Sequence, residues 1–258
     1  MINVIKEHME SIFEKGTRED GRKFDAYRKI TVEYGISPKS AEGSAKVTIG
    51  DTIVVAGIKL EVGTPFPDTP DEGALMVNAE LLPLSNPKFE MGPPTIDSIE
   101  LSRVTDRVIR ESRFVDFNKL CIKKGEKCWM IMVDIYPLND AGNLFDAAAL
   151  AALAALKDAK YPEFDGEKVD YSKRTNKSLP LGKLPMACTI MKIGNTLFVD
   201  PTPAEEEVID SRLTIGLLDD DRVCSMQKGG EEGLTIEEVD KMVELAIKKA
   251  KELRNALK

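Results

Sequence analysis

A seven-residue stretch, IGDTIVV at residues 49–55, recurs as IGNTLFV at residues 193–199. In each copy, apolar residues flank a Gly-Asp or Gly-Asn pair, which is the pattern of two strands joined by a two-residue hairpin turn. The copies lie 144 residues apart, too far for a solenoid repeat and suitable for a duplicated domain. We therefore predict two similar α/β lobes. Because such turns are common in hairpins, two unrelated hairpins are the alternative explanation.

The first copy lies in a stretch whose hydrophobic spacing predicts alternating strands and helices. Apolar residues Ile2, Ile5, Met9 and Ile12 recur at helical spacing and Gly16 follows as a stop, so we expect an amphipathic N-terminal helix. Strands are expected at residues 30–32, 45–49, 52–62, 74–84 and 128–138, and helices at residues 96–115 and 146–160.

The second copy follows a polar segment, residues 163–184, whose prolines and glycines predict a linker. The chain closes with a helix from Thr235, where Glu238 three residues later completes a capping box. Strands of this half are expected at residues 187–193, 196–199, 213–218 and 223–227. The predicted organisation is an N-terminal helix and turn (1–28), lobe 1 (29–162), the linker (163–184) and lobe 2 (185–258).

Composition limits the classes of partner. The 258 residues carry 36 Lys+Arg against 44 Asp+Glu, so the net charge of −8 excludes a globally basic nucleic-acid coat, and an anionic partner must meet a local patch. No apolar run has the length of a membrane span, and we expect a cytoplasmic protein. The single histidine, His8, rules out a multi-histidine metal site. The cysteines are expected to be reduced and mostly buried: Cys121, Cys128, Cys188 and Cys224.

The helix at residues 96–115 carries an arginine stripe. Helical spacing places Arg103, Arg107 and Arg110 on the side opposite its apolar residues, where guanidinium groups can hold phosphates. Acidic residues interleave with these arginines: Asp97, Glu100, Asp106 and Glu111. On spacing alone, a solvated and ion-paired helix is as good an explanation as anion binding.

Two other charged clusters have a functional and a structural interpretation. The charges from Arg18 to Arg28 surround a glycine turn and indicate a salt-bridged turn. Carboxylates at Asp200, residues 205–207 and Asp210 follow an apolar strand and are suited to Mg²⁺ binding or acid–base chemistry, although charge runs at strand ends are usually solvated turns. The phosphate-binding glycine motifs and the nucleophile-elbow motif do not occur.

The pattern Arg-x-Asp-Gly-Arg-x-x-Asp-x-x-Arg at residues 18–28, followed by Gly43-Ser44-Ala45, resembles the opening of the RNase PH superfamily. The resemblance continues through residues 99–103, 140–143 and 199–202, and within the superfamily it is strongest to the non-catalytic RNase PH-like subunit of the archaeal exosome. It implies an α/β (α+β) fold of two βαβα-type lobes, the ribosomal protein S5 domain 2-like fold, with an added N-terminal helix. It also implies a hexameric ring of three heterodimers that degrades RNA from the 3′ end with inorganic phosphate.

The chain departs from the active members at three places. Ile96 and Asp97 stand where an Arg-Arg pair is expected, and Gly142-Asn143-Leu144 replaces a Gly-Ser-Arg turn that binds phosphate. The two catalytic aspartate positions hold Glu206 and Arg212. Leucine has no guanidinium to hold phosphate, and an arginine cannot replace a carboxylate in acid–base or metal chemistry. The resemblance therefore implies a chain that does not carry out phosphorolysis by itself.

We expect a subunit that structures the active site of a catalytic RNase PH-like partner and positions single-stranded RNA through Arg103, Arg107 and Arg110. RNA-binding cap subunits are further implied partners. No cofactor or metal is expected in this chain, since phosphate is used at the partner's site. One alternative is a free-standing phosphorolytic exoribonuclease that uses Asp200 and Glu206 with a metal. Another is a scaffold that does not contact RNA.

Overall fold

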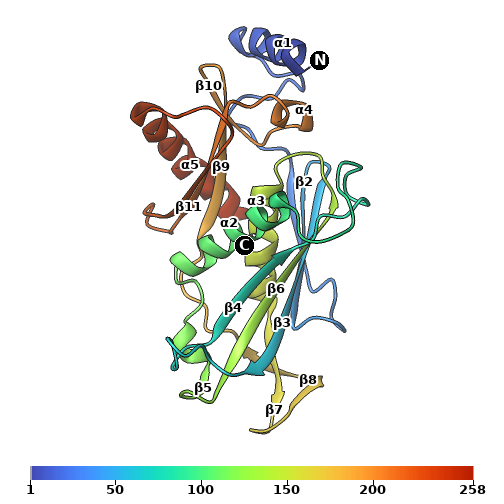
Figure 1. The fold of residues 1–258 in the computed structure, drawn as a ribbon, viewed down its shortest axis with the longest axis vertical. Helices are drawn as coiled ribbons and strands as arrows, with labels where there is room; N and C mark the ends of the chain where they lie inside the picture. Colours follow the sequence, from blue (N-terminus) through green and yellow to red (C-terminus); the bar gives the residue numbers. More distant parts are fainter. Residues whose placement is uncertain (1, 258) are drawn as a thin grey trace.

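Two β-sheets lie on either side of a helical layer in the computed structural model, which describes residues 2–257 and the side chains of residues 4–257 (Figure 1). Helices α2 and α3 lie between the sheets, and α5 packs on the smaller sheet. The larger sheet has the order β1-β2-β3-β6-β4, with β5 beside β6, and the smaller sheet has the order β10-β9-β11-β12. This arrangement confirms the mixed α/β class. None of the helices within residues 2–257 is long and apolar enough to cross a membrane.

The elements have the following bounds. The strands of the two large sheets are β1 (Ile30–Tyr34), β2 (Gly43–Ile49), β3 (Thr52–Gly63), β4 (Ala74–Ala79), β5 (Cys121–Lys123), β6 (Lys127–Asn139), β9 (Met186–Ile193), β10 (Thr196–Val199), β11 (Ser211–Leu217) and β12 (Val223–Gly229). The helices are α1 (Ile2–Glu14), α2 (Ile96–Glu111), the 3₁₀ turn η1 (Phe117–Leu120), α3 (Leu144–Asp158), α4 (Pro203–Glu206) and α5 (Ile236–Ala256).

The two copies of the repeated stretch form hairpins of the same geometry. Residues 49 and 52 are paired in the β2–β3 hairpin, and residues 193 and 196 are paired in the β9–β10 hairpin. In both turns the glycine has a positive φ, 57° at Gly50 and 54° at Gly194, as the first central residue of a type II′ turn requires. Beyond these hairpins the two sheets differ in topology, because β4 and β6 of the larger sheet pair in parallel and are connected through α2.

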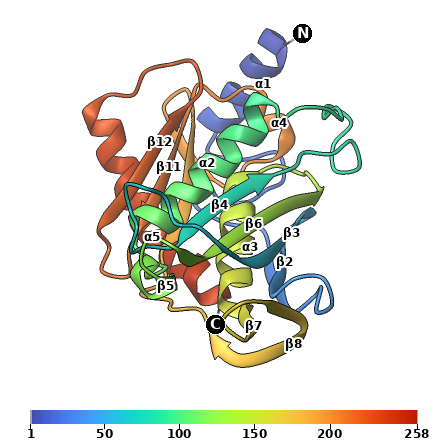
Figure 2. The same ribbon diagram turned by 60° about the horizontal axis from the view of Figure 1, so that its bottom comes forward.

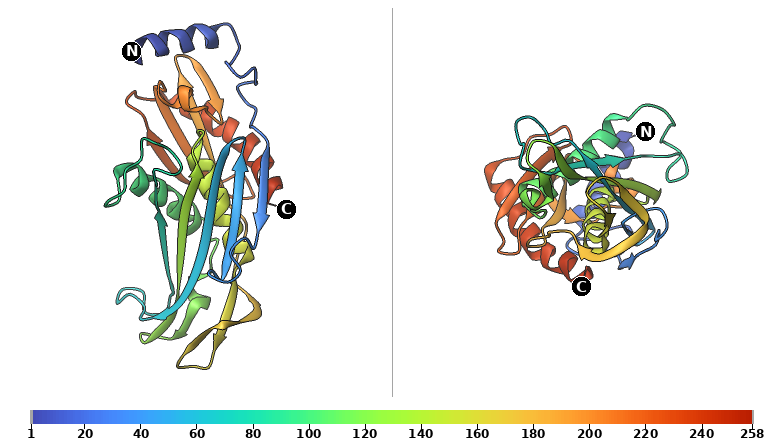
Figure 3. Two further views of the ribbon diagram at one scale, coloured as in Figure 1. Left: turned by 90° about the vertical axis from the view of Figure 1, so that its right-hand side faces the viewer. Right: turned by 90° about the horizontal axis from the view of Figure 1, so that it is seen from below.

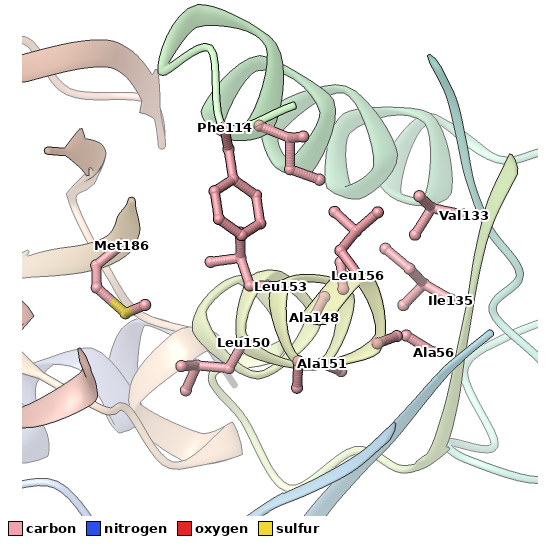
Figure 4. Packing of buried hydrophobic residues seen from close by; sticks show 14 of the residues in the cluster. Ala56, Phe114, Val133, Ile135, Ala148, Leu150, Ala151, Leu153, Leu156 and Met186 are labelled. Carbon is pink, nitrogen blue, oxygen red and sulfur yellow. The ribbon is translucent and has the colours of Figure 1, made fainter. Parts of the chain in front are cut away.

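The core centres on α3, which is buried on all sides because it lies between the sheets (Figure 4). Leu153 lies next to Phe114, Leu150 and Leu156 extend from other sides of the helix, and alanines cover much of its remaining surface. The small side chains let β2 approach closely: a Cβ at Gly43 would lie 2.4 Å from the carbonyl oxygen of Ala155. This close approach fixes the C-terminal end of α3 against β2, and the candidate site begins at the other end of the helix.

Helix α1 lies across one end of the molecule, next to the smaller sheet (Figure 3). Met9 and Phe13 are buried against residues of β9 and β10, including Phe198, and Ile5 and Ile12 are partly buried beside them. The amphipathic helix and its apolar face are therefore confirmed, while the side chain of Ile2 lies outside the described residues. His8 is exposed, and its Nε2 atom lies 3.5 Å from a carboxylate oxygen of Glu19.

The predicted linker is wrong in its local structure. Within residues 163–184 the chain continues a two-stranded hairpin formed by β7 (Lys160–Phe164) and β8 (Val169–Ser178), seen at the lower end in Figures 1 and 2. The rings of Tyr161 and Phe164 pack on Trp129, with centroids 5.2 and 5.6 Å away. Most of β8 is exposed, so its sequence lacks the alternation of a half-buried strand. The strand expected at 74–84 also ends early, at Ala79, where its pairing with β6 stops.

Candidate functional site

The arginines of the 18–28 segment bind carboxylates far away in the sequence. Asp200 is fully buried, and its carboxylate accepts hydrogen bonds from the backbone and guanidinium of Arg28 at 2.7–2.9 Å, from Arg22 at 2.6 Å and from the Asn143 amide at 2.9 Å. Burial by itself would raise the pKa of Asp200, but the hydrogen bonds and charge of Arg28 outweigh it and hold the pKa below its usual range. Asp200 is therefore a structural anion whose bonding capacity is already used.

A second buried pair joins the same segment to α4. The guanidinium of Arg18 binds both carboxylate oxygens of Glu205, at 2.8 and 2.5 Å, and also donates to the carbonyls of Val199 and Asp200. Glu205 completes a capping box with Thr202 at the start of α4. The Thr-x-x-Glu spacing of this box was a signal in the sequence that our prediction missed. These bonds attach the N-terminal segment to the end of β10 and so fix the position of Glu206.

The predicted degenerate positions converge around one cavity. Gly142 has a φ of 86°, and a Cβ there would lie 2.4 Å from the carbonyl oxygen of Pro201, so this position requires glycine. Asn143 follows in the left-handed region at φ 65°, and its backbone N–H donates to Oε1 of Glu206 at 2.8 Å. Leu144 begins α3 and lines the cavity. Glu206 and Arg212 line it as well, so all five residues lie together.

The cavity has a volume of about 250 Å³ and an acidic lining. Four carboxylate residues contribute to it, Asp97, Glu100, Asp140 and Glu206, against the single cation of Arg212. Arg212 already donates to Oε2 of Glu100 at 2.5 Å. Burial raises the pKa of Glu206 to about 7, and the charge of Asp140 adds to this effect. An inorganic phosphate ion would face uncompensated carboxylates here, which opposes its binding.

The arginine stripe divides into free and paired members on α2. The apolar side of the helix is buried as predicted, and Arg103, Arg107 and Arg110 are all exposed. Within residues 2–257, Arg103 makes no hydrogen bond or ion pair, and Arg107 makes one exposed hydrogen bond, at 3.2 Å to Gln227. Both therefore have donors available for an anionic partner.

Arg110 differs because its guanidinium is committed within the chain. It forms an i,i+4 ion pair with Asp106, with donor–acceptor distances of 2.7 and 3.1 Å, and donates to the carbonyl of Leu75. It also lies over the ring of Phe117, with Cζ 5.8 Å from the centroid. The hydrogen bonds that Arg110 donates to the Asp106 carboxylate raise the pKa of Arg110 above its usual value. The two explanations of the stripe thus apply to different residues: Arg110 is ion-paired, whereas Arg103 and Arg107 are available.

A buried polar cluster next to the cavity was not predicted from the sequence. Asp146 accepts hydrogen bonds from the Tyr27 hydroxyl at 2.6 Å and from the backbone N–H of Thr189 at 2.8 Å, so it connects the N-terminal segment, α3 and β9. Burial raises the pKa of Asp146 to about 7. Burial also raises the pKa of Cys188, whose Sγ lies 3.3 Å from the same hydroxyl. All four cysteines are free thiols, of which Cys128 and Cys188 are buried.

Comparison with known proteins identifies the family. Residues 26–162 match the model of domain 1 of the 3′ exoribonuclease family, RNase PH, and residues 183–249 match domain 2 of that family. The chain belongs to the RNase PH family. The resemblance inferred from residues 18–28 is therefore confirmed, and the two matched domains follow the two sheets.

Archaeal proteins are among the relatives that match nearly the full length of the chain. The exosome complex component Rrp42 of Archaeoglobus fulgidus is 45% identical over 258 residues, covering 100% of this chain and 97% of that protein. The protein of the same name from Methanothermobacter thermautotrophicus is 42% identical over 252 residues, covering 97% and 93%. A solved Archaeoglobus fulgidus exosome with RNA bound to the active site contains a chain of the same fold, with a TM-score of 0.91, 44% identity and coverage of 100% and 99%. An archaeal exosome core gives a TM-score of 0.86 at 42% identity, with coverage of 99% and 97%.

Proposed function

We propose that this chain is a non-catalytic RNase PH-like subunit of an RNA-degrading exosome, in which it completes the active site of a catalytic partner and positions RNA. The observation that carries the proposal is the state of the degenerate cavity. Arg212 stands at a catalytic aspartate position, is paired with Glu100, and is surrounded by carboxylates instead of a phosphate-binding turn. Such a site lacks the phosphate grip, and only one of its two catalytic positions, Glu206, holds a carboxylate for phosphorolysis.

The relatives support the assembly part of this proposal. Proteins named as exosome components match along nearly the whole chain, and one neighbouring structure is an exosome with RNA at its active site. We extend this to a hexameric ring of three heterodimers with RNA-binding cap subunits and a cytoplasmic location. In that ring inorganic phosphate is used at the partner's site, and this chain needs no cofactor of its own.

The RNA-positioning role rests on Arg103 and Arg107. Their guanidinium groups are exposed on one face of α2 and have donors to spare, which suits contacts with a phosphate backbone. Such contacts do not depend on base sequence, as a nuclease that moves along RNA requires. A local pair of cations also reconciles RNA binding with a net charge of −8.

A free-standing phosphorolytic enzyme is not favoured. That alternative uses Asp200 with Glu206 at a metal, but Asp200 is fully buried and bonded to Arg22, Arg28 and Asn143. A carboxylate that is neutralised in this way has little capacity left for a metal ion or a proton.

The decisive test is phosphate-dependent degradation of a single-stranded RNA by the purified chain alone and after mixing with its catalytic RNase PH-like partner. We expect release of nucleoside diphosphates only from the mixture. Release by the lone chain, once contaminating nucleases are excluded, would overturn the proposal. If the Arg103→Glu/Arg107→Glu variant assembles with the partner and degrades RNA as the native mixture does, the chain is a scaffold and the positioning role is wrong.

A further inference from the structure

Two of the four cysteines face each other across neighbouring antiparallel strands. Cys121 begins β5, and the register of the β5–β6 pair places it directly opposite Cys128 of β6, at the lower end of the larger sheet (Figure 1). Residues opposite each other on antiparallel strands have side chains on the same face and Cα atoms about 4.5–5.5 Å apart, within the roughly 4.4–6.8 Å that a disulfide spans. The backbone therefore already holds these two thiols in position to be joined.

A bulge beside Cys121 gives its strand room to adjust. The register shifts by one residue between Cys121 and Lys123, so Ile122 is an extra residue of β5. This strand has three residues, and within the described part of the chain it pairs with β6 alone. A short strand with an irregular ladder can take up the small backbone shift that closing a disulfide needs.

The two thiols differ in their access to solvent, and this difference assigns their roles. Cys121 is partly exposed, whereas Cys128 is fully buried. Burial raises the pKa of Cys128, and the neighbouring Cys121 adds to this effect. A reagent in solution therefore reaches Cys121 first, and Cys128 reacts with the sulfur of its neighbour.

The other two cysteines have no such neighbour. Cys188 in β9 and Cys224 in β12 lie on strands whose partners in the sheet, β10 and β11, contain no cysteine. Among the described residues there is also no group of three or more His, Cys, Asp or Glu side chains that could hold a metal ion. Zinc needs about four ligands, so the facing thiols suit disulfide chemistry better than metal binding.

We propose that Cys121 and Cys128 form a reversible disulfide, with a low-molecular-weight disulfide as the oxidant. The Cys121 thiolate attacks one sulfur of the oxidant, whose S–S bond breaks and releases one small thiolate. Cys128 then gives up its proton, and its sulfur attacks the Cys121 sulfur and displaces the second small thiolate. The two small thiolates take up the two thiol protons, so the protein loses two electrons and the oxidant becomes two small thiols.

The disulfide holds the β5–β6 hairpin against the loop that precedes β4. The backbone N–H of Gly125, in the hairpin turn, donates to the carbonyl of Pro70 at 2.7 Å. Just before β5, the carbonyl of Phe117 accepts from the backbone N–H of Gly73 at 2.9 Å. Closing a covalent ring at the base of the hairpin removes conformational freedom from it and so restricts opening of these contacts. The site is separate from the arginine stripe and does not depend on the proposed exosome role.

The test is incubation of the folded full chain with oxidised glutathione, followed by acid quenching, unfolding, alkylation of the remaining thiols and mass spectrometry of tryptic peptides. We expect residues 120–123 linked to residues 128–157, with Cys188 and Cys224 alkylated. The thermal midpoint of the oxidised chain should be at least as high as that of the reduced chain. Hydrogen exchange of the β5 amides should slow at least about tenfold on oxidation.

Single substitutions test the order of the two steps. Cys128→Ala removes the second thiol and should leave Cys121 as a stable mixed disulfide with glutathione. Cys121→Ala should leave Cys128 reduced, because the oxidant does not reach its buried sulfur. Cys224→Ala, which removes another partly exposed thiol, is the matched control and should give the same linked peptides as the native chain.

Absence of the linked peptides overturns the proposal, as does a glutathione adduct that persists on Cys121 of the native chain. A lower thermal midpoint in the oxidised chain would show that the bond does not fit the native strand pairing, and unchanged exchange of the β5 amides would overturn the clamping role. If an alanine variant fails to fold, the peptides and thermal midpoint of the native chain decide the question. Because the assay contains no RNA, phosphate or partner subunit, its failure would leave the exosome proposal untouched.

Discussion

The contrast between free and paired arginines on α2 predicts a specific change in the salt dependence of RNA binding. The perturbation is the double variant Arg103→Met/Arg107→Met, assembled with the catalytic partner. Each phosphate contact on a single strand contributes about 0.7 to the slope of log K against log salt concentration, so losing two contacts should reduce the slope by about 1.4. Between about 50 and 200 mM salt, the native complex should then lose about sevenfold more affinity than the variant.

The matched control is Arg110→Met, on the same helix face. Its guanidinium is already bonded to Asp106 and to the carbonyl of Leu75, so its removal should leave the salt slope unchanged. The assay is fluorescence anisotropy of a labelled single-stranded RNA without phosphate, so that no phosphorolysis occurs. Arg103 has no partner within residues 2–257, so its removal should not alter stability. If Arg110→Met reduces the salt slope as much as the double variant does, then the assignment of Arg103 and Arg107 as RNA contacts and of Arg110 as an ion-paired residue is wrong.

Three further predictions concern stability. Arg28→Met leaves the buried carboxylate of Asp200 without its main partner and should lower the free energy of unfolding, measured by denaturant titration, by about 3 kcal/mol. Adding Asp200→Asn should recover much of this loss, and no recovery would contradict the pairing. Because the pKa of Asp146 is raised to about 7 in the folded chain, the folded chain holds this proton more tightly than the unfolded chain, and stability should fall as pH rises from about 4 to 7. Asp146→Asn should make the thermal midpoint less dependent on pH over this range. An unchanged dependence would contradict the prediction. Gly43→Ala places a Cβ 2.4 Å from the α3 backbone, forces β2 away from the helix and should lower the free energy of unfolding by about 1–3 kcal/mol. A thermal midpoint equal to that of the native chain would contradict this prediction.

Most secondary-structure elements and the family could be predicted from the residues alone. Helical spacing predicted α1, α2 and α3, alternation predicted the long strands, and the repeated Gly-Asp and Gly-Asn pairs predicted two hairpins that the structure contains. These predictions are correct because turn chemistry, capping and amphipathic periodicity depend on residues within a few positions of one another. The substitutions at residues 142–144, 206 and 212 were likewise visible without coordinates.

Which charged side chains are free to bind a partner depends on long-range contacts in the folded chain. Arg18 and Arg28 pair with Glu205 and Asp200, more than 170 residues away, and no local pattern distinguishes such bonds from the salt-bridged turn that we expected. The β7–β8 hairpin escaped prediction because its stability comes from Tyr161 and Phe164 packing on Trp129, not from alternation. The cavity around Arg212 exists because β11, α2 and α3 meet there. Burial and long-range pairing set the charge and hydrogen-bonding capacity of a side chain, and these follow from packing that the order of residues shows only indirectly.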